Sequence, residues 1–503
     1  MFPEKVTIPD TPESLVMIIP CYNETQEELT AALDSLVDQK NIDEHQKVVM
    51  IICDGRARGK GMEKTTAQYL LEDILPMDAG SSRKTIEKAY IAWDQQSMDV
   101  TVQKGSYRGM PYCCVVKHQN QGKRDSLIVL RSFLYKYNIR HERPESIFKP
   151  EFFAEMATFL AGAGMDHVDD LIGMDADTVF EDICVSELLK QARLPNTLGV
   201  CGLVAVDFKG EKWGGLWKLY QTCDYALSQG LRRLHQSIVT NCVTCLPGCC
   251  QLFRVCEESC GDHIMLDRFG YHPTPTDDIV KQIRANASED GNHVCHMLSA
   301  YSHAGWKTRQ AIRARAFTDV PQSWSVFLSQ RRRWSLGTTA NELLLIRESG
   351  IHWFERIIAF SNCLTWLLSI SIAVAATSFY IRGVAPRWIS YALLGIVLTR
   401  IVYYILMVFW FPRTSRERKQ YLLGLFGYLI VGRLVSALIL LYAMYYIDSF
   451  GWGKTRKVVS EASAPSGNLE PIRDEEASLG MEKRTQPTTQ VLDLQGDSSS
   501  SSS

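Results

Sequence analysis

The sequence predicts an α/β domain with a mostly parallel sheet, followed by an α-helical transmembrane region. In the first 330 residues, short apolar runs alternate with stretches in which apolar residues recur at helical spacing, a pattern typical of α/β folds. The most strongly apolar residues instead gather between residues 357 and 447. The net charge is only −2, which leaves no basic footprint for nucleic acid and excludes that class of partner.

Four short apolar runs are of strand type, and they cover residues 14–20, 48–54, 112–117 and 170–175. Thr25 and Glu28 follow the first run at the spacing of a capping box. Leu29, Leu33 and Leu36 then form an apolar stripe at helical spacing. The first unit is therefore predicted to be strand, loop, helix and strand.

Three apolar stretches, at residues 357–380, 388–411 and 421–447, each exceed the roughly 20 residues that cross a bilayer. Aromatic residues at their ends, such as Trp388 and Trp410, suit the membrane interface. Arg400 and Arg433 interrupt two of the stretches. An intramembrane arginine usually faces a bundle interior or a wet cavity, so these two either line a polar path for a substrate or pair with another helix.

The sequence gives conflicting signals on the side of the membrane that carries the C-terminus. Residues 412–420 include Arg413, Arg416, Arg418 and Lys419, which predicts that this segment is cytoplasmic, as is the large N-terminal domain. Three crossings would then leave the C-terminus outside, yet the basic residues at 454, 456 and 457 favour the inside. One apolar stretch can therefore be interfacial or re-entrant.

The cysteines indicate the cellular compartment of the protein, and the composition of the C-terminal segment indicates whether that segment folds. Fifteen cysteines lie at irregular spacings, and the first twenty residues lack the pattern of a secretory signal. Together these features predict reduced thiols in the cytosol. Beyond Val459 the chain is rich in Ser, Glu and Pro and ends in six serines, which predicts disorder.

Polar residues follow the predicted strands where a parallel sheet binds ligands, outside the carboxyl ends of its strands. Asn23 and Glu24 follow the first strand, Asp54 ends the second, and Asp175-x-Asp177 ends the fourth. Two carboxylates at this spacing can share a divalent cation with a diphosphate, although Asp-x-Asp alone more often marks a surface turn. Asp54 either accepts a hydrogen bond from a base or ribose, or forms an Asp-Gly turn.

Three further motifs offer polar chemistry. Lys123, in the Gly-Lys-Arg-Asp run at 122–125, suits a phosphate, with a solvated basic loop as the alternative. Glu289 or Asp290 is a candidate to take a proton from an acceptor hydroxyl. The Gln-Arg-Arg-Arg-Trp run at 330–334 precedes the apolar stretches. It is either a lipid-facing basic patch or a site where arginine holds a diphosphate and Trp334 packs against a sugar.

Together, and in this order, the motifs resemble those of fungal chitin synthases, which are processive inverting glycosyltransferases of family 2. The shared motifs are Pro20-Cys21-Tyr22-Asn23-Glu24, Ile52-Cys53-Asp54-Gly55, Gly122-Lys123-Arg124-Asp125-Ser126, Asp175-Ala176-Asp177, Cys245-Leu246-Pro247-Gly248-Cys249, Glu289-Asp290 and Gln330-Arg331-Arg332-Arg333-Trp334. A segment at 448–459 also resembles the Ser-Trp-Gly-x-Thr-Arg segment of one chitin synthase division.

The resemblance implies a nucleotide-sugar transferase domain of GT-A type, with UDP-N-acetylglucosamine as donor and a growing β-1,4-linked chain as acceptor. In this comparison the uridine would be held by Tyr22, Glu24 and Asp54. The donor nucleotide would be contacted by Lys123 and Asp175, and Mg²⁺ or Mn²⁺ would be coordinated by Asp177. The general base would be Asp290, with Glu289 beside it. The diphosphate and the acceptor chain would be bound by Gln330, Arg333 and Trp334.

The expected organisation is a cytosolic glycosyltransferase domain at 1–330 and an interfacial helix region at 331–356. About three transmembrane helices at 357–447, a Trp-Gly-x-Thr-Arg-like segment at 448–459 and a disordered tail at 460–503 follow. An integral protein of the plasma membrane or of secretory vesicles is expected, with the lipid bilayer as a partner. Because three helices make a thin channel wall, homo-oligomer formation is one way to complete it.

One departure from the family pattern bears on function. The family usually has Gly-Glu-Asp-Arg where this chain has Ser288-Glu289-Asp290-Gly291, and the missing arginine affects how the acceptor or the base is positioned. Two alternatives therefore stand beside chitin synthesis. One is a polysaccharide synthase that uses another UDP-sugar, as hyaluronan synthases do, and the other is a catalytically weak homologue that acts as a membrane scaffold.

Overall fold

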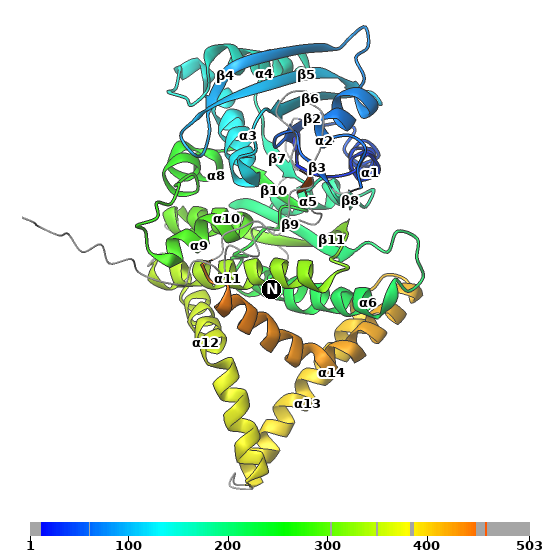
Figure 1. Ribbon diagram of the computed structural model, residues 1–503, viewed down its shortest axis with the longest axis vertical. Helices are drawn as coiled ribbons and strands as arrows, with labels where there is room; N and C mark the ends of the chain where they lie inside the picture. The colour runs from blue at the N-terminus through cyan, green and yellow to red at the C-terminus, as the bar shows by residue number, and fades with distance from the viewer. Residues whose placement is uncertain are drawn as a thin grey trace, which may run out of the picture. The chain divides into compact units, whose positions relative to one another are not determined.

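The computed structural model describes residues 12–59, 61–301, 304–348, 351–382, 387–448 and 458–459 (Figure 1). Its strands are β1 (Ser14–Cys21), β2 (Gln46–Cys53), β3 (Arg58–Gly59), β4 (Ser82–Ile91), β5 (Ser97–Tyr107), β6 (Met110–Lys117), β7 (Asp170–Gly173), β8 (Thr178–Phe180), β9 (Thr197–Val206), β10 (Gln251–Arg254), β11 (Lys307–Thr318) and β12 (Val458–Val459).

Helices lie between the strands at several points of the chain up to β11, and the last four helices follow one another. They are α1 (Gln26–Val37), α2 (Thr66–Gln68), α3 (Gly122–Asn138), α4 (Pro150–Gly162), α5 (Cys184–Ala192), α6 (Gly215–Asp224), α7 (Leu231–Val239), α8 (Glu257–Cys260), α9 (Ile279–Ala287), α10 (Glu289–Ala300), α11 (Trp324–Arg347), α12 (Trp353–Ile381), α13 (Arg387–Trp410) and α14 (Ser415–Tyr445).

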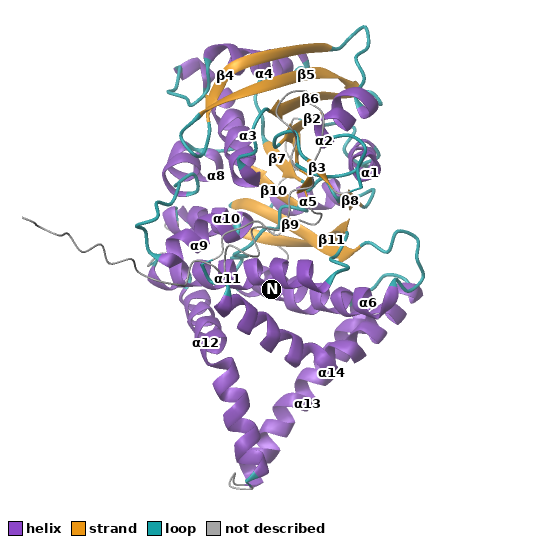
Figure 2. Cartoon of the chain, in the orientation of Figure 1, coloured by secondary structure: helices purple, strands orange, loops and turns teal. Residues whose placement is uncertain are grey.

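Within the described residues, one ten-stranded sheet has the order β4-β5-β6-β2-β1-β7-β10-β9-β11-β8. The four central strands, β6, β2, β1 and β7, run parallel to one another, and antiparallel pairs lie on both sides of them. These central strands are the four that the sequence predicts. The predicted class, an α/β domain followed by apolar helices, is confirmed (Figure 2).

The central strands read as continuous apolar runs because helices cover both faces of the sheet. On one face, Val16 and Ile18 of β1 pack in a core with residues of α3 and α4. On the other face, Leu15 and Met17 pack in a core with residues of α1 and α5. The predicted capping box at the start of α1 is present, since the Thr25 hydroxyl accepts from the Glu28 amide. The fifteen cysteines are all free thiols, as expected.

The last three helices coincide with the three apolar stretches of the sequence. By length and composition, Trp353–Phe379 and Ser415–Tyr445 are candidate membrane spans, and α13 has a shorter apolar part, Leu394–Trp410. Helices α12 and α13 run away from α6 and α11 and converge at their far ends (Figure 1).

Helix α14 behaves differently from α12 and α13, because it contacts the α/β domain along its length. Leu425 packs with Cys223 of α6, Val435 packs with Phe327 of α11, and Ala443 packs with Leu336 of α11. The predicted boundary at residue 330 falls inside α11, which is one helix of 24 residues. The segment predicted at 448–459 and the tail predicted at 460–503 lie almost entirely outside the described residues.

Candidate active site

One cavity of about 860 Å³ lies at the carboxyl ends of the central strands and is closed on another side by α11. It is lined by residues of the loops after β1, β2 and β7, by the starts of α3 and α10, and by one face of α11. Every site residue predicted from sequence lines this cavity: Tyr22, Glu24, Asp54, Lys123, Asp175, Asp177, Glu289, Asp290, Gln330, Arg333 and Trp334.

The ends of β1 and β2 form one end of the cavity. Glu24 is held by its own loop, because its Oε2 accepts from the Tyr22 amide at 2.6 Å. Burial raises the pKa of Glu24 to about 7. Burial also raises the pKa of the Tyr22 hydroxyl, and the nearby Asp54 charge adds to this effect. Asp54 is 4 % exposed, and its Oδ1 accepts from the Gln121 amide at 2.9 Å.

Sequence reasoning missed the group that fixes Asp54. The Lys117 ammonium, at the end of β6, is fully buried and lies 2.5 Å from Asp54 and 2.9 Å from Asp125. Asp125 in turn accepts from the Tyr90 hydroxyl at 2.7 Å. A buried charge needs such partners, so one lysine holds two carboxylates in place. A lysine that ends an otherwise apolar strand is the one local sign of this role.

The Asp175-x-Asp177 loop follows β7 and lines the cavity. Burial, with the charges of Asp175 and Glu28, raises the pKa of Asp177 to about 7. Among the described residues, no three His, Cys, Asp or Glu side chains are arranged to hold a metal ion alone. The two aspartates nevertheless fit a hard cation that takes one or two carboxylates and completes its shell with phosphate oxygens. Such a cation would also relieve the repulsion among these carboxylates.

Lys123 links this loop to the start of α10. Its Nζ lies 2.6 Å from Asp175, 3.8 Å from Asp290 and 4.0 Å from Glu289. Burial opposes the charged lysine, but these carboxylates outweigh it and raise the pKa of Lys123. The Lys123 side chain therefore remains protonated and positively charged between Asp175 and Asp290.

Asp290 is partly buried, with its side chain 21% exposed, and one of its oxygens has no hydrogen-bond partner in the part of the chain that the structure describes. Its Oδ2 accepts from the Gly248 amide at 2.8 Å, and its Oδ1 has no hydrogen-bond partner among the described residues. Burial raises the pKa of Asp290 to about 6, with Lys123 opposing and Glu289 adding to the effect. A carboxylate in this state can accept a proton from a bound hydroxyl.

The motif at 330–334 divides its side chains between different tasks. Gln330, Arg333 and Trp334 line the cavity, because positions three and four residues apart share a helix face. Arg331 instead pairs with Asp224 at 2.9 Å and stacks on Trp334 at 4.2 Å. Arg331 thus holds Trp334 in position from behind.

Arg332, in the middle of the motif, contacts the end of α14. Its guanidinium donates to the Tyr446 carbonyl at 3.5 Å, so the run is not one continuous lipid-facing patch. Gly291 lines the cavity, and a Cβ there would lie 3.2 Å from both Asn341 and Ser288. A side chain at position 291 would therefore press on Asn341 and Ser288, and the glycine keeps this part of the cavity wall closely packed.

Comparison with known proteins agrees with this geometry. Residues 3–476 match the protein family described as chitin synthase. Chitin synthase 8 of Gibberella zeae is 45% identical over 462 residues, which cover 90% of this chain and 68% of that protein. Chitin synthase 8 of Verticillium dahliae is 44% identical over 400 residues, which cover 75% of this chain and 64% of that protein. The chain thus spans roughly two thirds of the length of these relatives.

Among solved structures, a mannosyltransferase from Pyrobaculum calidifontis in complex with GDP-Man and Mn²⁺ is 13% identical, with a TM-score of 0.43, over 89% of this chain and 90% of that one. The family match, by contrast, runs along nearly the whole sequence and includes every motif that lines the cavity. Because this match covers residues 3–476 and a curated relative is 45% identical over 90% of this chain, the chain belongs to the chitin synthase family of glycosyltransferases.

Proposed function

We propose that the chain transfers N-acetylglucosamine from UDP-N-acetylglucosamine to the non-reducing end of a growing β-1,4-linked chain, with inversion at the anomeric carbon. The observation that carries this proposal is the position of Lys123, 2.6 Å from Asp175 and 3.8 Å from Asp290. A cation here can stabilise a leaving diphosphate while an acceptor hydroxyl loses its proton close by.

The donor nucleotide would lie at the ends of β1 and β2. Tyr22, Glu24 and Asp54 would hold the uridine, in the crevice where open α/β sheets bind their ligands. Asp54 suits this role because Lys117 and the Gln121 amide fix its carboxylate. A fixed acceptor can recognise an N–H of the base or a ribose hydroxyl without first being ordered.

Asp177, with Asp175 beside it, would hold Mg²⁺ or Mn²⁺, and diphosphate oxygens would complete the coordination. When bound, the ion supplies positive charge against the leaving diphosphate. The burial of Asp177 and its raised pKa support this assignment, because a neighbouring cation favours the charged carboxylate.

Asp290 would be the general base. Its Oδ1 accepts the proton of the acceptor hydroxyl while that oxygen attacks the anomeric carbon from the face opposite the diphosphate. The glycosidic bond forms as the bond to UDP breaks, so UDP leaves with the electron pair and the proton stays on Asp290. The Gly248 amide already donates to Oδ2, so Oδ1 is the oxygen that has no hydrogen-bond partner among the described residues and is left to accept the proton.

Gln330, Arg333 and Trp334 would contact the diphosphate and the acceptor. Arg333 adds a second cation to Lys123 at the cavity wall. Trp334 offers an indole against which a sugar ring can pack, and Arg331 and Tyr225 hold that indole in place.

The test is transfer by membranes that contain the full chain. Labelled UDP-N-acetylglucosamine should give an insoluble product that chitinase degrades. Asp290→Asn should slow its formation at least about 100-fold, whereas Asp267→Asn, at an exposed position, should not. A product formed from another UDP-sugar in a donor panel would favour the alternative polysaccharide synthase. Binding of UDP without any product would favour the scaffold and contradict the proposal.

We also propose a membrane arrangement with two crossings, in which α12 and α13 cross the bilayer and α14 lies along its cytoplasmic face. The contacts of Leu425, Val435 and Ala443 with α6 and α11 support this arrangement. The opposite face of α14 exposes apolar side chains such as Phe426 and Leu434, as in helices that lie in the membrane interface.

Two crossings would put the catalytic domain and the C-terminus on the same, cytosolic side, in the plasma membrane or in secretory vesicles. The basic residues at 454, 456 and 457 then obey the positive-inside rule. Glycosylation acceptor sites introduced between α12 and α13 and after Ser503 test this arrangement in microsomes. We expect modification at the first site alone, and modification after Ser503 would show that α14 crosses.

A further inference from the structure

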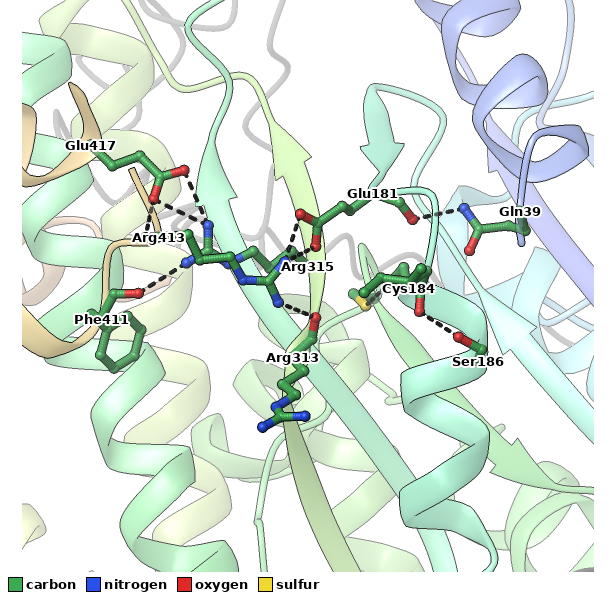
Figure 3. Close-up of polar contacts among 11 residues, drawn as sticks. Gln39, Glu181, Cys184, Ser186, Arg313, Arg315, Phe411, Arg413 and Glu417 are labelled. Carbon is green, nitrogen blue, oxygen red and sulfur yellow. Dashed lines mark hydrogen bonds and ion pairs between the residues drawn. The ribbon is translucent and has the colours of Figure 1, made fainter. Parts of the chain in front are cut away.

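Helix α13 turns into α14 at a corner, here residues 411–417, that contacts the catalytic domain beside the Asp175-x-Asp177 loop. The Arg413 Nη1 lies 2.7 and 2.6 Å from the two carboxylate oxygens of Glu181. The Arg413 Nη2 donates to the Arg313 carbonyl at 2.8 Å. Figure 3 shows these contacts joining the corner to the segments around β8 and β11.

A second ion pair connects the same corner to β11. The Arg315 Nη1 lies 3.1 and 3.2 Å from the carboxylate oxygens of Glu417, and its Nη2 donates to the Phe411 carbonyl at 2.9 Å. The Arg413 amide also donates to Glu417 at 2.8 Å. The side chain of Arg315 is only 5% exposed and that of Glu417 is 25% exposed, so solvent screens this pair less than an ordinary surface pair.

Glu181 connects the corner to the proposed donor site through a very short stretch of chain. It directly follows β8, and Asp177 directly precedes β8. Among the described residues, β8 pairs with β11 alone and at three positions only. Such a short edge strand has few ladder hydrogen bonds of its own, so contacts outside the ladder contribute much of what holds it in place.

The remaining supports of β8 come from α1 and from the backbone. The Phe180 amide donates to the Ser35 hydroxyl at 3.1 Å, and the Glu181 amide donates to the Arg315 carbonyl at 3.0 Å. The Gln39 side chain donates to the Glu181 carbonyl at 2.9 Å. These three hydrogen bonds hold the backbone of Phe180 and Glu181. The Glu181 carboxylate is held separately, by its ion pair with Arg413.

We propose that Arg413 and Glu181 are positioning residues for the donor site, through which the α13–α14 corner holds β8 and the Asp175-x-Asp177 loop in their binding geometry. This inference rests on the proposed function, since it assumes that the loop binds the nucleotide and its cation. The corner thereby couples the membrane helices to the donor end of the cavity, and the acceptor end on α10 and α11 is left unaffected.

The test uses Arg413→Ala, Glu181→Gln and the double variant in the full chain, purified in detergent. We expect each single variant to raise the KM for UDP-N-acetylglucosamine about 10-fold at saturating Mn²⁺, with kcat changed less than twofold. The dissociation constant of UDP with Mn²⁺, measured by calorimetry without turnover, should rise by the same factor. Because the two side chains act through one contact, the double variant should lose no more than either single variant.

The chain supplies a matched control in the ion pair made by Asp182, the residue that follows Glu181. Lys40 pairs with Asp182 at 2.6 Å, and both side chains are well exposed, at 66% and 47%, so Lys40→Ala should leave both constants unchanged. Arg413→Lys, which keeps the charge but not the fork, should give an intermediate loss. Thermal unfolding identifies any variant that does not fold. If Arg413→Ala does not fold, the KM of Arg413→Lys for UDP-N-acetylglucosamine tests the inference in its place.

Three results would overturn the inference: unchanged UDP affinity in Arg413→Ala, losses that add in the double variant, or an equal loss in Lys40→Ala. An inactive wild-type protein that still binds UDP with Mn²⁺ would contradict the proposed function alone, because the affinity measurements would still test the corner. A wild type that binds no UDP would overturn both.

Discussion

At the scale of single residues, Gly248 illustrates how little space the site leaves. A Cβ at this position would lie 2.5 Å from the Lys123 Nζ and 2.9 Å from both carboxylate oxygens of Asp290. These are the ends of flexible side chains, so Gly248→Ala would displace them and spare the backbone. A shift of about 1 Å can cost roughly 100-fold in rate.

We therefore expect Gly248→Ala to fold normally and to transfer sugar about 100-fold more slowly, measured by initial rates beside thermal unfolding. Gly162→Ala is the control, because a Cβ there would meet nothing within 4 Å, and it should keep both the rate and the unfolding temperature. A Gly248→Ala protein with normal activity would show that the close contact of Lys123 and Asp290 is not needed.

The raised pKa of Asp290 predicts the pH dependence of transfer. Burial raises this pKa to about 6, and a base acts only when deprotonated, so kcat/KM should rise as the pH rises through about 6 and then level off. Asp290→Asn should remove this limb and lower the rate at least about 100-fold.

Asp177 could produce a similar limb, since its pKa is also raised, to about 7. The two are separable, because higher Mn²⁺ should move a limb due to Asp177 to lower pH and leave that of Asp290 in place. An Asp290→Asn enzyme with an unchanged profile would exclude Asp290 as the base.

At the scale of elements, a glycine sets how closely α14 approaches α6. A Cβ at Gly424 would lie 2.2 Å from the Leu219 carbonyl oxygen, which is backbone and cannot rotate away. Gly424→Ala should therefore push the helices apart and lower the unfolding temperature of the protein in detergent by several degrees.

Gly427 is in the same helix, and a Cβ there would meet nothing within 4 Å. Gly427→Ala should be neutral or raise stability, because alanine favours a helix over glycine by up to about 1 kcal/mol. Equal losses in the two variants would mean that helix α14 itself, and not its contact with α6, is sensitive to substitution.

The same elements show what could be predicted from the sequence. β1 could be predicted because both of its faces are buried, which makes Leu15–Ile19 one continuous apolar run. The contacts of α14 with α6 could not, because length and apolarity are the same whether a helix crosses a bilayer or lies along it. The choice depends on tertiary contacts such as that of Gly424 with Leu219.

The site shows the same division. The motifs supplied eleven residues that line the cavity. Most of them follow a strand end or lie on one face of α11, whereas Glu289 and Asp290 begin α10. The partners that hold them could not be predicted in the same way. Lys117 serves Asp54 and Asp125, which come from different segments of the chain, and no local pattern records such a pairing. Arg413 likewise meets Glu181 only in the folded chain.

At the scale of the whole molecule, two kinds of surface are joined in one chain. The sheet domain buries its large apolar side chains, whereas α12, α13 and α14 expose theirs, with Leu367 at 65%, Ile396 at 66% and Phe426 at 68%. Soluble monomers rarely expose contiguous apolar surface of this extent, and the hydrophobic effect favours its burial in lipid.

This surface predicts how the protein leaves a membrane. Salt at 1 M reduces the range of electrostatic attraction to about 3 Å, so it would release a protein held by the basic residues of the α13–α14 corner alone. Burial of apolar side chains in the bilayer core does not depend on such screening. We therefore expect high salt and alkaline carbonate to leave the chain in the membrane pellet, and detergent to release it, as followed by immunoblotting. Recovery in the salt wash would mean that charge holds the chain to the membrane surface, and the two proposed crossings would then be wrong.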